Sequence, residues 1–138
     1  MTEDTTEANR VRVQQIYGEY VSGNLPFLIE ALAEDICWTS GDDAVAAPWC
    51  GQGIGRDAVR EYFAALAAEC EIIDFRVGRI IADGDWVAVT ATVRARYRHS
   101  GAEREIAKVD VLRLQDGQVR EFREYYGGEA GPLAHRAA

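Results

Sequence analysis

The sequence predicts an α+β domain in which three helices pack on one face of a curved antiparallel sheet. Helical periodicity is confined to the first half of the chain, and alternating strand patterns fill the second half. Helices grouped before successive antiparallel strands indicate an α+β fold. No linker or internal repeat interrupts the chain, so we expect one domain over residues 1–138, with 1–8 and 129–138 as flexible tails.

Three segments have helical patterns. Residues 8–22 place apolar side chains at the i, i+3, i+4, i+7 spacing of one buried stripe. The range Pro26–Leu32 begins with a proline, which suits the first turn of a helix. Residues 56–70 show the clearest periodicity, with an apolar face formed by Val59, Tyr62, Phe63, Leu66, Ala67 and Cys70.

The strands follow in order. Ile36–Thr39 has strand composition, and residues 40–55 form a long irregular loop of the kind that is usually functional or disordered. Ile72–Ala82 and Trp86–Arg98 alternate apolar and polar residues. A hairpin then spans Ala107–Tyr126, with an Asp-Gly turn between its two strands.

Asp110 is the unusual residue of this hairpin. It shares a strand face with Ile106, Leu112 and Leu114, where a carboxylate costs free energy unless it is paired, hydrogen-bonded or protonated. It is therefore either a pocket acid or base with a raised pKa, or a structural carboxylate paired with Lys108 or an arginine.

A second acidic side chain, Glu124, shares a face with Phe122 and Tyr126 on the last strand. It is either a second pocket carboxylate or a partner of Arg120, two residues back on that face. Asp42 and Asp43 are either a solvated pair in the long loop or a base on a mobile lid.

Composition excludes several classes of function. The formal net charge is −8, with no basic stripe, which argues against nucleic acids and anionic membranes as partners. The start of the chain is polar and no apolar run could span a bilayer, so we expect a cytoplasmic protein. Two histidines and three cysteines without metal-like spacing predict no metal site and no Ser-His-Asp triad.

Three stretches resemble the nuclear transport factor 2-like superfamily, within it the SnoaL-like and ketosteroid-isomerase-like branch. They are Tyr20-Val-Ser-Gly-Asn-Leu25 with Leu32-Ala-Glu-Asp-Ile36, Gly55-Arg-Asp-Ala-Val-Arg-Glu-Tyr-Phe63, and Asp116-Gly-Gln-Val-Arg-Glu-Phe-Arg-Glu-Tyr-Tyr126. The resemblance implies a cone-shaped α+β barrel with a pocket between the sheet and the helices. It does not by itself imply one reaction, because this fold carries several.

The resemblance also implies roles for individual residues. Asp110 matches the carboxylic acid that donates a hydrogen bond to the oxyanion in ketosteroid isomerase. The family's general base falls at Ser40, and its helix tyrosine falls at Ile16, beside Tyr17. The chain therefore keeps one of the three steroid-isomerase groups.

On these grounds we expect a cofactor-independent acid/base enzyme of isomerase, cyclase or dehydratase type, acting on a small hydrophobic, cyclic carbonyl or polyketide-like substrate. The catalytic candidates are Asp110, Glu124 and Tyr17. The substrate-binding candidates are Trp38, Ser40, Trp49, Tyr62, Phe63, Leu112, Phe122 and Tyr126. The alternatives are a non-catalytic small-ligand binder of the same fold and an epoxide hydrolase.

The resemblance further implies a homodimer formed through the face of the sheet that points away from the pocket. The even-numbered residues of the Trp86–Arg98 strand, among them Trp86, Thr90 and Thr92, suit such an interface. Arg94 and Arg96 would then be paired or lie at its edge.

Overall fold

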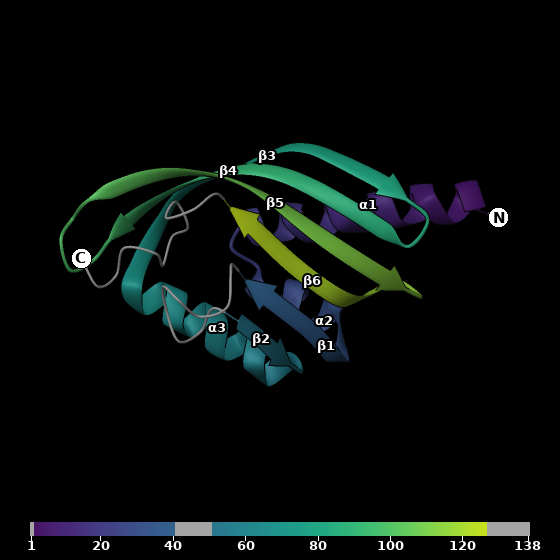
Figure 1. Cartoon of the computed structure of the whole chain (residues 1–138), viewed down its shortest axis with the longest axis horizontal. Helices are drawn as coiled ribbons and strands as arrows, with labels where there is room; N and C mark the ends of the chain where they lie inside the picture. The colour runs from purple at the N-terminus through teal and green to yellow at the C-terminus, as the bar shows by residue number, and fades with distance from the viewer. Residues whose placement is uncertain (1, 41–50, 127–138) are drawn as a thin grey trace.

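The computed structural model describes residues 2–40 and 51–126 (Figure 1). Trp49, Asp42, Asp43 and the tail 129–138, named above from the sequence, lie outside the described residues. Within these ranges, no helix is both long enough and apolar enough to cross a membrane.

Three helices are present, as expected: α1 (Thr2–Val21), α2 (Leu25–Ala31) and α3 (Arg56–Glu69). The helix α1 starts earlier than the expected residue 8. The side chain of Asn24 accepts a hydrogen bond from the Phe27 amide at 3.3 Å and so caps α2, whose first turn holds a proline.

Six strands form one sheet: β1 (Leu32–Ser40), β2 (Gly51–Ile54), β3 (Cys70–Asp83), β4 (Trp86–Tyr97), β5 (Glu103–Gln115) and β6 (Gln118–Tyr126). Their order is β2-β1-β6-β5-β4-β3. The last four strands pair antiparallel, as predicted. The strand β2 was not expected, because its sequence is rich in glycine.

The sheet is mixed rather than wholly antiparallel. The strand β1 runs parallel to β6, with Trp38 opposite Phe122 and Ser40 opposite Glu124. This pairing joins the first and last strands of the chain, so no local sequence pattern could reveal it. It brings Ser40 to the carboxylate-bearing end of the last hairpin.

The hairpin β5–β6 turns at Asp116 and Gly117, whose φ angles are 52° and 78°. Positive φ at both turn residues is what a two-residue hairpin turn needs, and it explains the Asp-Gly pair. The predicted hairpin is confirmed, and a register shift between Arg113 and Leu114 sets Asp110 directly opposite Glu124.

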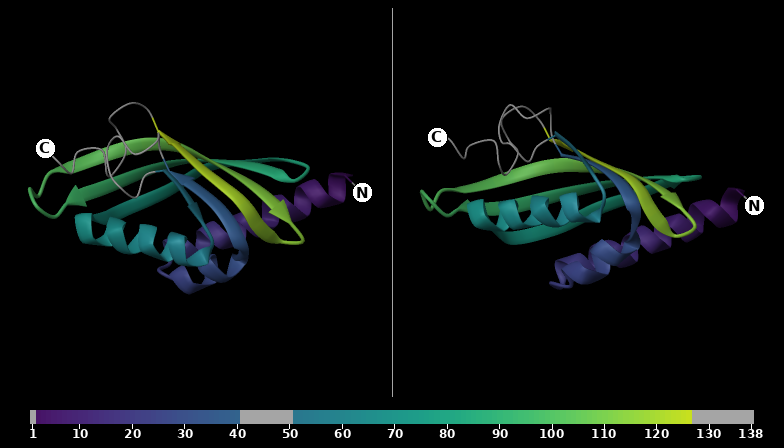
Figure 2. Two further views of the ribbon diagram at one scale, coloured as in Figure 1. Left: turned by 60° about the horizontal axis from the view of Figure 1, so that its bottom comes forward. Right: turned by 90° about the horizontal axis from the view of Figure 1, so that it is seen from below.

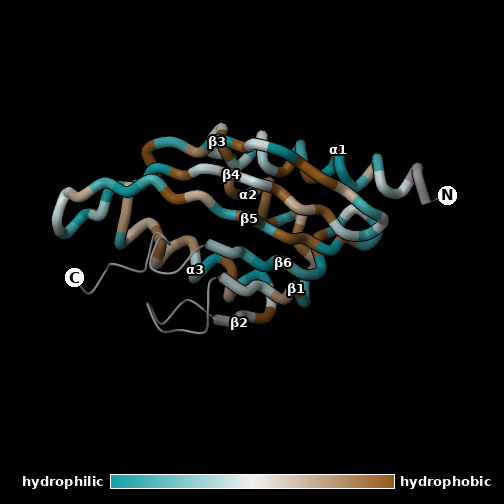
Figure 3. The backbone as a smooth tube through the Cα atoms, turned by 45° about the horizontal axis from the view of Figure 1, so that its top comes forward, coloured by the Kyte–Doolittle hydropathy of each residue, from teal (hydrophilic) through white to brown (hydrophobic). Residues whose placement is uncertain are grey.

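The helices lie on one side of the curved sheet, as the two views of Figure 2 show. The core lies between them and includes Val13, Ile16, Ile36, Val59, Leu66, Val89 and Leu114. Hydrophobic segments run along the central strands in Figure 3. Along β4, buried residues alternate with more exposed ones, as expected for a strand with one face on the core. The predicted α+β cone, in which the sheet and three helices surround a pocket, is confirmed.

Candidate active site

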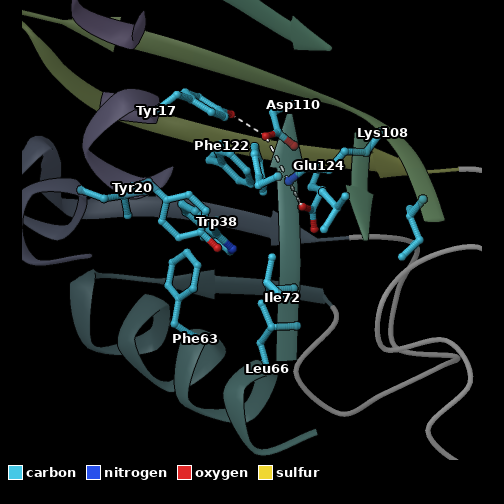
Figure 4. A pocket seen from close by; sticks show the side chains of 14 residues that line it. Tyr17, Tyr20, Trp38, Phe63, Leu66, Ile72, Lys108, Asp110, Phe122 and Glu124 are labelled. Atoms are coloured by element: carbon cyan, nitrogen blue, oxygen red, sulfur yellow. Dashed lines mark hydrogen bonds and ion pairs between the residues drawn. The ribbon is translucent and has the colours of Figure 1, made fainter. Parts of the chain in front are cut away.

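A cavity lies between the concave face of the sheet and the three helices (Figure 4). Its solvent-accessible space is about 50 Å³. Six aromatic side chains dominate its wall, namely Tyr17, Tyr20, Trp38, Phe63, Phe75 and Phe122. Its polar side chains are Lys108 and Asp110 from β5 and Glu124 from β6.

Asp110 is 1% exposed. Its position on the aliphatic face of β5 directs its side chain into this cavity. Its Oδ2 accepts a hydrogen bond from the Tyr17 hydroxyl of α1 and lies 3.3 Å from the Lys108 Nζ. Its Oδ1 is buried and has no hydrogen-bond partner among the described residues. One carboxylate oxygen is therefore anchored and the other is free to meet a ligand.

Lys108 joins the two carboxylates of the site. Its Nζ lies 2.5 Å from Glu124 Oε2 and 3.3 Å from Asp110 Oδ2, and its side chain is only 8% exposed. The ammonium also lies 4.9 Å from the ring centroid of Phe75, which favours a cation electrostatically. The predicted Lys108–Asp110 pair is thus present, but in the cavity wall rather than at the surface.

Both oxygens of Glu124 are occupied by protein groups. Oε1 accepts hydrogen bonds from Ser40 Oγ at 2.5 Å and from the Tyr62 hydroxyl at 3.2 Å, while Oε2 faces Lys108. Arg120, the alternative partner considered for Glu124, instead contacts Asp35 at 3.3 Å. Glu124 is consequently a fixed anion that positions Lys108.

Burial raises the pKa of Asp110 to about 6, and the charge of Glu124 adds to this increase. Lys108 and the hydrogen bond from Tyr17 act in the opposite direction without cancelling it. Asp110 therefore changes its charge close to neutral pH, as a general acid or base requires.

The neighbouring groups keep their usual charges. Burial alone would raise the pKa of Glu124, but the Lys108 charge and three hydrogen bonds outweigh burial and lower it. Burial opposes protonation of Lys108, yet the two carboxylates more than compensate and raise its pKa. Burial and the Asp110 charge raise the pKa of Tyr17, so its hydroxyl stays protonated and donates to Asp110.

The sequence-predicted binding residues divide into several groups. Trp38, Phe63 and Phe122 line the cavity, with Trp38 stacked on Phe122 at 3.7 Å between ring centroids. Ser40 and Tyr62 contribute indirectly, by holding Glu124.

The remaining predicted residues lie elsewhere. Leu112 belongs to the hydrophobic core, and Tyr126 is partly buried and packs against that core. Neither residue lines the cavity. Trp49 lies outside the described residues.

Two of the aromatic lining residues, Tyr20 and Phe75, were not among the residues that the sequence predicted to bind substrate. The stripe spacing that marked Tyr20 as buried could not distinguish the core from a cavity wall. Lys108 was noted only as a partner of Asp110. Its place two residues before an inward-facing aspartate was the available signal that it also points inward.

Metal binding finds no support in the side chains. No group of three or more His, Cys, Asp or Glu residues within 2–40 and 51–126 is arranged to hold a metal ion. The acidic side chains of the cavity are already bound to Lys108, Tyr17, Ser40 and Tyr62.

Solved structures with the same fold are numerous. An NTF2-like protein from Burkholderia xenovorans LB400 is 22% identical, covers 96% of this chain and 98% of its own, and has a TM-score of 0.77. A protein from Mesorhizobium loti, proposed to be a SnoaL-like polyketide cyclase, is 19% identical with coverages of 83% and 96% and a TM-score of 0.71.

A third structure, a proposed isomerase from Rhodopseudomonas palustris, is 15% identical, with coverages of 94% and 95% and a TM-score of 0.71. Identities this low show the fold and no more. None of the curated proteins matches the chain.

The family assignment comes from a sequence model rather than from these distant structures. The model of the SnoaL-like domain matches residues 13–122. This range runs from α1 to β6 and includes Tyr17, Lys108 and Asp110, although it ends before Glu124. The chain therefore belongs to the SnoaL-like domain family of the NTF2-like superfamily.

Proposed function

We propose that this protein is a cofactor-independent acid/base enzyme that moves a proton at the carbon next to a carbonyl group. The observation that carries the proposal is the state of Asp110. This side chain is buried in an aromatic cavity, is anchored at Oδ2 and is unpartnered at Oδ1 among the described residues. Its pKa of about 6 leaves it ionised and basic at neutral pH.

The hydrogen bonds indicate which oxygen exchanges the proton. Oδ2 already faces two donors, the Tyr17 hydroxyl and the Lys108 ammonium, so a proton on Oδ2 would meet other hydrogens. Oδ1 faces no donor from the described residues. The proton that Asp110 gains and loses is therefore placed on Oδ1.

The proposed reaction starts from the ionised form. Asp110 Oδ1 takes a proton from the carbon next to the carbonyl, and the electrons of the C–H bond form an enolate. Return of the same proton to another carbon gives an isomer. Attack of the enolate carbon on a second carbonyl of the substrate closes a ring, as in a cyclase, and the alkoxide that forms takes the proton from Asp110 Oδ1. Neither route requires a cofactor.

The cavity supports a small hydrophobic substrate. Its accessible space of about 50 Å³ corresponds to a few water molecules, so a ring-sized ligand has to displace side chains. Four side chains of the wall are only half-buried and can move aside for such a ligand, namely Tyr20, Phe63, Ile72 and Phe75. The proposed polyketide cyclase and the proposed isomerase among the structural neighbours are of the two reaction types proposed for this chain.

The test uses substrates that need only a base. In D₂O, the protein should catalyse exchange of the α-hydrogens of cyclopentanone, which proton NMR measures. It should also convert 3-cyclohexenone to its conjugated isomer, followed by ultraviolet absorbance. Asp110→Asn should lower both rates by about 10²–10⁴-fold, the usual contribution of a general base.

A matched control is available on the same hairpin. Asp116→Asn makes the same chemical change at the turn, where φ is positive and asparagine is well tolerated. It should keep the wild-type rates. Equal rates for Asp110→Asn and Asp116→Asn would remove Asp110 from the mechanism.

A non-catalytic binder of the same fold is the second candidate. The observation that favours it is the small cavity, whose second carboxylate is fully occupied by Ser40, Tyr62 and Lys108. Binding of cyclic ketones without exchange at any pH would support this function. Epoxide hydrolysis is not favoured. The resemblance implies an Asp-Arg-Asp set for that reaction, and no arginine lines the cavity among the described residues.

We also propose that two copies of the chain associate through the outer face of the sheet. Four large apolar side chains are exposed there, Ile81, Trp86, Val109 and Tyr125. Large apolar side chains exposed on one face of a sheet favour an interaction surface there. The arginines predicted to lie at its edge are paired, since Arg94 and Arg96 both contact Glu103.

A further inference from the structure

We propose that Trp38 is a catalytic residue whose indole N–H donates a hydrogen bond to the carbonyl oxygen of the substrate. This inference rests on the proposed function, because it names the group that the Asp110 reaction still lacks. From the sequence, Trp38 is predicted only to be one of several substrate-binding residues. The structure gives its nitrogen a more specific task.

The starting observation is a buried donor without an acceptor. Trp38 is 6% exposed, and its Nε1 is buried with no hydrogen-bond partner among residues 2–40 and 51–126. A buried N–H group normally has a partner, because its lost hydration is otherwise uncompensated. Trp38 lines the same cavity as Asp110, so a bound ligand can supply that partner.

The indole is held rigidly in place. Its ring is stacked on Phe122 at 3.7 Å with an interplanar angle of 11°, and it meets the rings of Tyr62 and Phe63, each at 5.7 Å. Packing on several sides fixes the direction of the N–H bond before a ligand arrives. A preorganised donor stabilises developing charge without reorganisation during the reaction.

Two residues of the cavity wall therefore carry unpartnered polar atoms of opposite character. Trp38 Nε1 is a donor, and Asp110 Oδ1 is an acceptor when ionised. In Figure 4, Trp38 comes from β1 and Asp110 from β5, and both belong to the cavity wall. A matching ligand carries an acceptor at one point and an acidic hydrogen at another.

This pair of atoms discriminates between chemical classes. An ammonium ion has only donors and would leave the indole N–H unmatched. A carboxylate has only acceptors and would meet Asp110 with like charge. An enolisable ketone has both features, a carbonyl oxygen for Trp38 and an α-hydrogen for Asp110. The structure thus favours a neutral enolisable carbonyl compound.

The role of Trp38 in the reaction follows from the electron flow. When Asp110 Oδ1 takes the α-proton, the C–H electron pair becomes the new C=C bond and the carbonyl π electrons move to oxygen. The negative charge develops on the atom that accepts from Trp38. When Asp110 returns the proton to carbon, the carbonyl re-forms and that charge disappears.

Indole N–H signals provide a direct test. The protein is labelled with ¹⁵N-tryptophan and titrated with cyclopentanone or with methylenecyclopentane, which replaces the carbonyl oxygen by a methylene group. Trp38→Phe assigns the signal. Cyclopentanone should move the Trp38 signal downfield, whereas methylenecyclopentane should not, and Trp86, which is exposed on the outer face of the sheet, serves as the internal reference.

The contrary outcomes are equally clear. A Trp38 signal that stays in place at saturating cyclopentanone, or that moves equally with both ligands, would overturn the proposal. Replacing Trp38 by its 3-benzothienyl analogue keeps the ring shape and removes only the N–H. This variant should lower the α-exchange rate by roughly 10²–10³-fold, as loss of one oxyanion donor does, and an unchanged rate would overturn the proposal.

The NMR measurement separates this inference from the proposed function, because it needs no turnover. Asp110→Asn should lose exchange activity and retain the ketone-dependent shift of Trp38. A shift without exchange in the wild-type protein would support Trp38 as a ligand donor and reject the enzyme. Exchange without a shift would support the enzyme and reject Trp38.

Discussion

Asp110 and Glu124 stand directly opposite each other on β5 and β6, so two carboxylates share one cross-strand pair inside the cavity. Like charges in this arrangement repel. Lys108, two residues from Asp110, supplies one positive charge between them. The cluster is neutral when Asp110 is protonated and carries one excess negative charge when it is ionised, which links catalysis to stability.

The first prediction concerns the stability of Asp110→Asn. The pKa of Asp110 is about 6 in the folded protein, against 3.8 for an unperturbed aspartate. At pH values between these two pKa values, Asp110 is more protonated in the folded state than in the unfolded state. The contribution of Asp110 to stability therefore falls as pH rises from about 4 to 6. Asparagine avoids that loss.

The variant should therefore gain stability relative to wild type as pH rises. The gain between pH 4 and pH 7 is on the order of 3 kcal/mol, from the size of the pKa change. Urea unfolding at several pH values measures it. A stability difference that does not vary with pH would contradict a raised pKa at Asp110.

The second prediction is a shift in the pH–rate profile of Glu124→Gln. The charge of Glu124 raises the pKa of Asp110, and its removal leaves Lys108 free to pair with Asp110 alone. The acid limb of the α-exchange profile, expected near pH 6 in wild type, should move to lower pH. Glu121→Gln on the same strand removes a carboxylate that pairs with Arg113 outside the cavity, and should leave the limb in place.

The third prediction is the opposite shift for Lys108→Met. The positive charge of Lys108 lowers the pKa of Asp110, so its loss should move the acid limb above pH 6. Glu124 would also lose its buried cation, and removing one partner of a buried ion pair typically lowers the free energy of unfolding by about 3–5 kcal/mol. Thermal unfolding and the pH–rate profile test both effects. An acid limb that stays near pH 6 would show that Lys108 does not act on Asp110.

The fourth prediction concerns Tyr17→Phe. The Tyr17 hydroxyl donates to Asp110 Oδ2 and lowers its pKa. Loss of this hydroxyl should move the acid limb to higher pH. It should also lower the free energy of unfolding by about 1.5–3 kcal/mol, the value of a hydrogen bond to a charged group. Tyr20→Phe is the matched control, because this α1 tyrosine also lines the cavity and no hydrogen bond joins it to Asp110. Equal pH profiles for the two variants would argue against a role for the Tyr17 hydroxyl.

The fifth prediction tests the outer face of the sheet. Light scattering should show a dimer for the wild-type protein. Val109→Glu should produce monomers, because Val109 lies in the exposed apolar surface and is 37% exposed. Val11→Glu places the same charge on an exposed valine of α1 and should leave the dimer intact. A wild-type protein that is strictly monomeric would reject the interface.

Local sequence patterns were sufficient for most of the fold. The Asp116–Gly117 turn, the alternation in β4 and β5 and the stripe of α1 each depend on neighbours in the chain, and all were confirmed. The parallel pairing of β1 with β6 was missed because it joins Trp38 to Phe122 across most of the sequence. Glycine-rich β2 was missed because its residues favour turns over strands.

The sequence by itself determined that Asp110 faces inward, because strand alternation leaves no other choice for a residue between Ile106 and Leu112. Only the tertiary structure decided what surrounds it. Tyr17 reaches Asp110 from the first helix, and the β5–β6 register sets Glu124 opposite it. A buried carboxylate takes its pKa from such contacts between distant segments, and contacts of this kind leave no periodic pattern in the chain.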